Sequence, residues 1–274
     1  AMSVSDRSVF TLAFHELLLE VIFIDTPTPE NIAQSIAKIN AHADEIAAFI
    51  YEPLVQGAGG IKMYDPLLMN QLVQSAKQNN IICVADEVMT GFWRTGKCFA
   101  SEYLQETPDI ICLSKGLTGG TMALGVTACT KKIYDAFVSD DALKTFFHGH
   151  SFTANPLACT AALASLDLLE QPGTLAAIQH VCAANEAFVP VLKSKTGNRY
   201  QVKNIRVLGT ILAFELDEGK DEYLNKISHT ITKRCLDAGV YLRPLGNTVY
   251  IMPPYCITER ELQQVYNTVI SLVD

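Results

Sequence analysis

The chain has 274 residues, of which 49% are hydrophobic and 18% are charged, a composition typical of a folded protein with a large core. Its formal net charge of −8 argues against nucleic acid as a partner, because binding to phosphates requires clustered lysine and arginine. No apolar run reaches the roughly 20 residues that cross a bilayer, and no secretory signal is evident, so we expect no membrane partner and a cytoplasmic location. The eight cysteines are scattered without a CxxC pair, which favours buried reduced thiols over disulfides or a metal site.

The first part of the chain alternates helical and strand-like patterns. Residues 1–25 show neither a helix cap nor a strand pattern, so we expect the chain to begin partway through a fold. Isoleucines at helical spacing predict a helix over residues 29–42, and the pattern of the next helix covers residues 66–78. Short apolar runs predict four strands, at residues 46–55, 81–85, 110–113 and 124–129. Such runs favour a mostly parallel sheet with helices on both faces.

The second part of the chain has a different pattern. An alanine- and leucine-rich helix is predicted from Pro156 to about Glu170, and Pro172-Gly173 interrupts it. We therefore expect a large domain over residues 1–172 and a small domain over residues 173–274. The small domain is predicted to be α+β, with helices over 174–193, 223–238 and 259–273 and strands near 207–216 and 249–252.

Polar residues follow three of the predicted strands directly. Glu52, Asp86 and Lys115 stand where these apolar runs end, and ligands of open α/β sheets bind beyond the carboxyl ends of the strands. Asp86 and Lys115 can form a structural salt bridge. Alternatively, Lys115 is an imine-forming amine, and Asp86 keeps the pyridine nitrogen of pyridoxal phosphate protonated, so that the ring accepts electrons from a carbanion. In that case Gly116 leaves room for the lysine to move.

Several motifs occur in one order and spacing that resembles the class III aminotransferases. They are EPLVQGAGG (52–60), ADEV (85–88), GFWRTG (91–96), PDI (108–110) and LSKGLTGG (113–120). The resemblance implies the fold of fold type I pyridoxal-phosphate-dependent transferases, a mostly parallel α/β sheet flanked by helices with an α+β carboxy-terminal domain. It also implies that Lys115 carries the cofactor covalently, that Asp86 contacts the pyridine nitrogen, that Val88 packs on the ring and that Glu52 lies in the pocket. For Val88 plain core packing, and for Glu52 the capping of nearby amides, remain alternatives.

The segment HGHSFTANP (148–156) resembles a loop that crosses to the other subunit in dimers of this family. The resemblance implies a homodimer with shared active sites, in which Ser151, or else Thr153, donates a hydroxyl to the cofactor phosphate. The alternative for either residue is capping of the helix that begins at Pro156.

Three further segments narrow the resemblance within the class: LTGGT (117–121), LRP (242–244) and YIMPPY (250–255). They are most similar to members that transfer the amino group of S-adenosylmethionine to 8-amino-7-oxononanoate, giving 7,8-diaminononanoate for biotin. Arg243 is then expected to hold a substrate carboxylate, and Tyr250 to line the substrate pocket. An interdomain contact is the alternative for both. Arg94 is expected at the pocket mouth, or else in a structural ion pair.

Two departures from the family pattern limit these expectations. Trp93 stands where relatives usually carry glycine, which bears on substrate choice. The glycine-serine phosphate loop and the aromatic side chain that stacks on the cofactor ring are expected to precede residue 1, which bears on cofactor affinity. Two other functions therefore stay open: a different class III ω-aminotransferase acting on ornithine, 4-aminobutyrate or a related amine, and a non-catalytic folded core.

Overall fold

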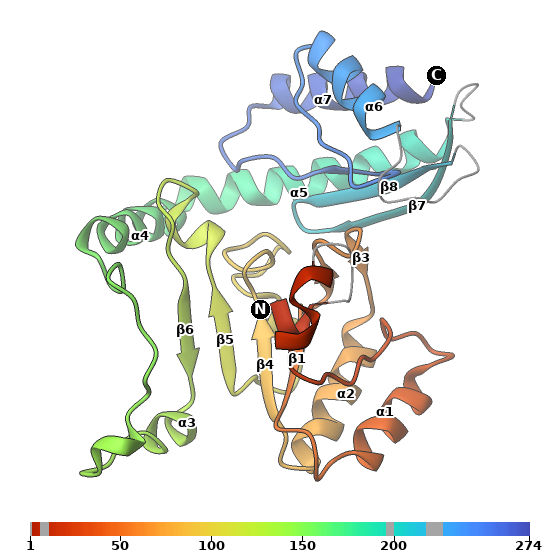
Figure 1. Ribbon diagram of the computed structural model, residues 1–274. Helices are drawn as coiled ribbons and strands as arrows, with labels where there is room; N and C mark the ends of the chain where they lie inside the picture. Colours follow the sequence, from red (N-terminus) through yellow and green to blue (C-terminus); the bar gives the residue numbers. More distant parts are fainter. Residues whose placement is uncertain (1, 6–10, 196–199, 218–226) are drawn as a thin grey trace.

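Two sheets, one above the other, organise the computed structural model, which describes residues 2–5, 11–195, 200–217 and 227–274 (Figure 1). A four-stranded sheet forms the lower part of the view, and a three-stranded sheet with its helices forms the upper part. The long helix α5 (Pro172–Lys193) runs across the molecule next to the three-stranded sheet. The proposed domain boundary at residue 172 coincides with the first residue of this helix.

The lower sheet has the strand order β1-β4-β5-β6. Its strands are β1 (Ala48–Tyr51), β4 (Ile82–Asp86), β5 (Ile110–Leu113) and β6 (Val126–Cys129). The first three are parallel, which confirms the expected mostly parallel sheet, whereas β6 pairs antiparallel with β5. Two short strands, β2 (Val55–Gln56) and β3 (Lys62–Met63), form a separate antiparallel pair after β1.

Helices α1 (Ile32–Ala41) and α2 (Pro66–Gln78) cover one end of this sheet. The Asp65 side chain caps α2 by accepting from the Leu67 amide at 2.7 Å, and proline at the first position begins the helix with the required φ. The buried face of α2 packs on the strand residues Cys83 and Ala85 in a common core. At the other end of the sheet, every residue of β6 is exposed, so the expected cover of helices is lacking there among the described residues.

Other helical segments occur in this part of the chain. These are η1 (Met2–Val4), η2 (Leu12–Leu17), η3 (Ala100–Tyr103), η4 (Lys115–Thr118), α3 (Lys131–Asp135), η5 (Ala142–Lys144) and α4 (Pro156–Leu169). Asn155 caps α4, since its Oδ1 accepts from the Ala158 amide at 2.9 Å.

The upper part contains β7 (Gln201–Leu208), β8 (Ile211–Asp217) and β9 (Thr248–Ile251), all antiparallel, with helices α6 (Ile227–Asp237) and α7 (Glu259–Val273). The single strand predicted over residues 207–216 is wrong, because Gly209 and Thr210 turn the chain into a β7–β8 hairpin. The helix predicted over 223–238 is present from Ile227, and its first four residues lie outside the described part of the chain. These elements form the expected α+β arrangement.

Strand β8 takes part in two hydrophobic cores. Leu212, Phe214 and Leu216 face the core built with α5, α6 and α7. Ile211 and Ala213 point the other way, into the core of the four-stranded sheet. Because successive side chains of a strand point to opposite faces, one strand joins the two halves of the molecule.

Helix α5 corrects one expectation from the sequence. Its 22 residues are long and apolar enough to cross a membrane by length and composition alone, although no such run was expected. In the structure, Val181, Phe188 and Leu192 of this helix are buried in the small-domain core. The helix therefore packs one face against the small-domain core.

All eight cysteines are free, as expected. Cys83 and Cys235 are buried, whereas Cys129 and Cys256 are exposed, so the expectation of buried thiols holds for only part of the set. No cluster of histidine, cysteine and carboxylate side chains with metal-ligand spacing occurs among the described residues.

Candidate active site

The parallel register of β1, β4 and β5 brings three sequence-predicted residues to one edge of the sheet. Tyr51 pairs with Ala85, so the next residues, Glu52 and Asp86, lie at the ends of two neighbouring strands. Asp86 in turn lies opposite Cys112, three residues before Lys115. The strand-end cluster is the name used below for Glu52, Asp86 and Lys115.

Asp86 ends β4 as a half-buried carboxylate whose orientation is fixed locally. Its Oδ1 accepts a hydrogen bond from the backbone amide of Val88 at 3.0 Å. The backbone amide of Glu87 donates to the carbonyl of Cys112 at 3.0 Å, which ties the same turn to β5. Val88, half-buried beside this carboxylate, is placed by the same turn.

Lys115 begins helix η4 in a strained backbone conformation. Its φ is +45°, in the left-handed region that side chains other than glycine rarely adopt, and such strain concentrates at functional sites. The Lys115 side chain is exposed, and within the described residues its ammonium has neither a hydrogen-bond nor an ion-pair partner. A structural salt bridge between Lys115 and Asp86 is therefore absent from this part of the chain, and the amine is open to a ligand.

Gly116 serves packing at this turn. A Cβ at this position would lie 2.9 Å from Cδ2 and 3.1 Å from Cβ of Phe92. The ring of Phe92 therefore packs against the backbone next to the lysine. This packing explains the glycine at position 116, whereas the sequence suggested that the glycine leaves room for the lysine to move.

Electrostatics connect the three members of the strand-end cluster. Burial raises the pKa of Glu52 above its usual range, the hydrogen bond from the Gly57 amide opposes this rise, the charge of Asp86 adds to it and the charge of Lys115 opposes it. Glu52 thus interacts with both Asp86 and Lys115, and the three side chains share one electrostatic environment.

Glu87 follows Asp86 directly, and the sequence pattern did not distinguish the two carboxylates. Its side chain is fully buried, and its carboxylate accepts four hydrogen bonds. The donors are the Thr90 hydroxyl at 2.5 Å, the Ala100 amide at 3.0 Å, the Ser101 amide at 2.7 Å and the Ser101 hydroxyl at 2.6 Å. Glu87 thereby closes the loop that carries Val88, Phe92 and Arg94.

Arg94 lies at the joint between the two halves. Its Nη1 donates to the carbonyl of Pro253 at 2.8 Å and to the hydroxyl of Thr210 at 3.3 Å, and its guanidinium lies 4.4 Å from the ring centre of Tyr255. Burial lowers the pKa of Arg94, and the charge of Tyr255 opposes this change. None of these three contacts is the ion pair that was the alternative expected for Arg94, and a role in substrate binding stays a prediction.

Within the described residues, no hydrogen bond or ion pair joins three other predicted site residues to the strand-end cluster. Tyr250 is half-buried on β9 and packs toward the core of the four-stranded sheet, whereas Arg243 is exposed on the loop before β9. Ser151 is exposed and has no hydrogen bond to the strand-end cluster within the described residues. The helix cap considered for Ser151 and Thr153 is supplied by Asn155, and the Thr153 hydroxyl accepts from the His150 amide at 3.0 Å.

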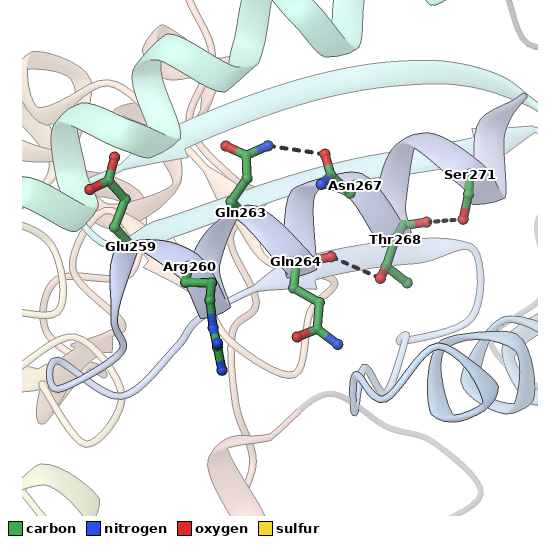
Figure 2. Close-up of a pocket in the computed structure, with 7 residues that line it drawn as sticks. All are labelled: Glu259, Arg260, Gln263, Gln264, Asn267, Thr268 and Ser271. Atoms are coloured by element: carbon green, nitrogen blue, oxygen red, sulfur yellow. Dashed lines mark hydrogen bonds between the residues drawn. The ribbon is translucent and has the colours of Figure 1, made fainter.

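A concavity of about 800 Å³ lies over helix α7 (Figure 2), which is on the side of the three-stranded sheet away from the four-stranded sheet (Figure 1). It is lined by polar side chains of that helix: Glu259, Arg260, Gln263, Gln264, Asn267, Thr268 and Ser271. Several of these side chains bond to each other or to the helix, as with Gln263 and Asn267 at 3.0 Å. The predicted chemistry does not involve this surface.

The strand-end cluster fits the chemistry of pyridoxal phosphate. An unpaired lysine amine on one strand end can hold an aldehyde, and a half-buried carboxylate on the next strand can hold a protonated pyridine nitrogen. The mostly parallel sheet, the lysine and the carboxylate together define a pyridoxal-phosphate-dependent transferase of fold type I.

Comparisons with known proteins agree with this class. The class-III aminotransferase family matches residues 1–273. The chain is 42% identical to an adenosylmethionine-8-amino-7-oxononanoate aminotransferase of Synechococcus elongatus, with 100% of this chain and 66% of that protein covered, and 35% identical to the Helicobacter pylori enzyme of the same name, with 100% and 64% covered. A crystal structure of the Methanocaldococcus jannaschii enzyme of that name superposes with a TM-score of 0.88 at 32% identity, covering 97% of this chain and 62% of that one.

The chain belongs to the class III aminotransferase family. Members of this family depend on pyridoxal phosphate. The chain spans 66% and 64% of the two relatives compared above.

Proposed function

We propose that the protein containing this chain transfers the amino group of S-adenosylmethionine to 8-amino-7-oxononanoate and so makes 7,8-diaminononanoate for biotin. The observation that carries this proposal is the strand-end cluster, in which Lys115 and the fixed carboxylate of Asp86 follow two neighbouring parallel strands. The identity of 42% and 35% to two relatives named for this reaction supports the choice of substrates.

Each of the predicted site residues would have a separate role in this reaction. Pyridoxal phosphate, when bound, supplies an electron sink for the electrons released at the α-carbon of the substrate. Asp86 would hold a proton at the pyridine nitrogen, and Val88 would pack on the ring. Lys115 would hold the cofactor and then move a proton at the α-carbon with its Nζ. Arg243 would bind a substrate carboxylate, with Tyr250, Glu52 and Arg94 around the substrate.

Borohydride trapping with peptide mapping tests the chemistry of the site. After incubation with pyridoxal phosphate and reduction, we expect the label on Lys115, its loss in Lys115→Ala, and its retention in Asp86→Asn. Asp86→Asn should instead abolish transamination, because the ring nitrogen loses its counter-charge. A label on another lysine, or none, contradicts the assignment.

A donor screen tests the substrates separately. We expect amino transfer from S-adenosylmethionine to 8-amino-7-oxononanoate. Turnover of ornithine or 4-aminobutyrate with 2-oxoglutarate, without activity toward S-adenosylmethionine, would instead favour a different class III ω-aminotransferase.

We extend the proposal to a homodimer in which Ser151 contacts the cofactor phosphate of the partner subunit. Supporting it is a series of large exposed apolar side chains, which in a soluble monomer is unusual. These are Tyr134, Phe137, Val138, Leu143, Phe146, Phe147, Phe152, Leu157, Leu163 and Leu168. Light scattering during size-exclusion chromatography should give a dimer mass, and Phe147→Glu should weaken the dimer.

The eight free thiols support a reducing compartment such as the cytoplasm.

A further inference from the structure

Arg206 of β7 reaches from the small domain to the loop that follows β2. Its Nε donates to the carbonyl of Ile61 at 2.7 Å, and its Nη2 donates to the carbonyl of Gly60 at 2.6 Å. On the small-domain side, its Nη1 bonds to Glu215 Oε1 at 3.0 Å and to the carbonyl of Asn204 at 2.6 Å. Only 15% of the Arg206 side chain is exposed. The guanidinium therefore joins the two halves of the molecule through fixed, directional bonds.

The loop that Arg206 holds is strained. Ile61 has a φ of +52°, and this left-handed conformation is a costly one for a β-branched residue. Its side chain is buried, and its amide donates to the carbonyl of Gly57 at 3.2 Å, which closes the loop. Strained backbone persists only where surrounding contacts impose it. The two bonds from Arg206 are such contacts.

The other end of this loop reaches the strand-end cluster. The amide of Gly57 donates to Glu52 Oε2 at 2.8 Å. A Cβ at Gly57 would lie 2.7 Å from the sulfur of Met89 and 3.3 Å from Glu52 Oε2, so the backbone is held close against the carboxylate. The position of this amide therefore depends on the conformation of the loop closed at Ile61.

Glu52 in turn faces the groups that would carry the chemistry. The charged and titratable side chains that act on it are Asp86, Lys115 and Tyr64, whose hydroxyl donates to the Glu52 backbone carbonyl. A carboxylate that loses the Gly57 amide loses a bond that favours its ionised form. A change at Glu52 would therefore alter the field at the lysine and at Asp86.

We propose that Arg206 is a positioning residue for the active site, which sets the ionisation of Glu52 by holding the loop from Gly57 to Ile61. The proposal rests on the proposed function only in that Glu52 belongs to that site. Its test uses the chain without cofactor or substrate, so its failure can be distinguished from failure of the proposed activity.

The test is a pH titration of one amide by nuclear magnetic resonance. Gln56-Gly57 is the only glutamine-glycine pair in the sequence, so labelling glutamine carbonyls with ¹³C and glycine amides with ¹⁵N isolates the Gly57 signal. Its proton shift follows the ionisation of the carboxylate that accepts its bond. Glu52→Gln should remove the titration and so assign it to Glu52.

Arg206→Met should raise the midpoint of this titration by about one pH unit and reduce its amplitude, because the amide moves away from the carboxylate. Arg206→Lys, which keeps the charge and can reach one carbonyl, should give a smaller rise. Glu215→Gln is the matched control: it removes the ion pair on the small-domain side and leaves both carbonyl bonds, so the midpoint should not change.

An unchanged midpoint in Arg206→Met, with a lower melting temperature, would show that Arg206 only stabilises the fold. If Arg206→Met does not fold, an unchanged midpoint in Arg206→Lys overturns the proposal equally. A rise in Glu215→Gln as large as in Arg206→Met would also overturn it, because the carbonyl bonds would then not be responsible.

Discussion

The buried carboxylate of Glu87 offers a quantitative prediction about the stability of the loop next to the candidate active site. In Glu87→Gln, one carboxylate oxygen becomes an NH₂ group that faces the amide of either Ala100 or Ser101. The Thr90 and Ser101 hydroxyls can rotate to accept a bond, but a backbone amide cannot. One buried donor is left unpaired and one charge-assisted bond is lost, so we expect a loss of about 2–4 kcal/mol in the free energy of unfolding.

Urea unfolding followed by circular dichroism measures this loss, and calorimetry should show a melting temperature lower by roughly 4–12 °C. Glu102→Gln is the matched control, because Glu102 lies in the same loop, accepts from the Phe99 amide at 2.9 Å and is exposed. We expect its loss to stay within about 1 kcal/mol. Equal losses in the two variants would refute the argument that burial makes Glu87 important.

Three further predictions concern the neighbouring turn and the joint. Gly116→Ala places a Cβ 2.9 Å from the Phe92 ring and should cost about 1–3 kcal/mol, whereas Gly173→Ala, with nothing within 4 Å, should not destabilise the protein in the same urea assay. Tyr255→Phe removes the bond at 2.5 Å to the Phe92 carbonyl and should cost about 1 kcal/mol at neutral pH. Burial raises the pKa of Tyr255 to about 12, so the difference in stability should hold below pH 10, shift by about 2 kcal/mol toward the variant as the pH rises to 12, and thereby change sign. A constant difference in pH-dependent unfolding would contradict this. Trp93→Gly relieves the strain of a φ of +65°, about 1 kcal/mol, but loses packing worth about 2–3 kcal/mol, so we expect a net loss of stability in the same assay. A net gain would contradict this balance.

The sequence predicted the elements whose ends carry local signals. The helices predicted over 66–78 and 259–273 have these bounds in the structure, where Asp65 caps α2 and Thr258 forms a capping box with Glu261 at the start of α7. The antiparallel direction of β6 could not be predicted, because the spacing of apolar residues indicates which side chains are buried and does not indicate strand direction. The β7–β8 hairpin was missed for a related reason: apolar residues continue on both sides of Gly209, so the turn did not interrupt the pattern.

The site was predictable where one rule applied. Residues that follow parallel strands meet at one edge, and this rule placed Glu52, Asp86 and Lys115 together. Glu87 has the same residue type and nearly the same position as Asp86, and only the three-dimensional structure shows that it points into the protein. Arg206 lies in a strand far along the chain from Gly60 and Ile61, and no local pattern connects them.

Strand β8 contributes side chains to both hydrophobic cores, and this affects how the molecule unfolds. A shift of this strand by one residue would exchange the side chains that serve the two cores, so neither half tolerates a slipped register. A fragment beginning at residue 173 would leave Ile211 and Ala213 facing water. We therefore expect a single cooperative melting transition for the whole chain, and a carboxy-terminal piece expressed alone should aggregate.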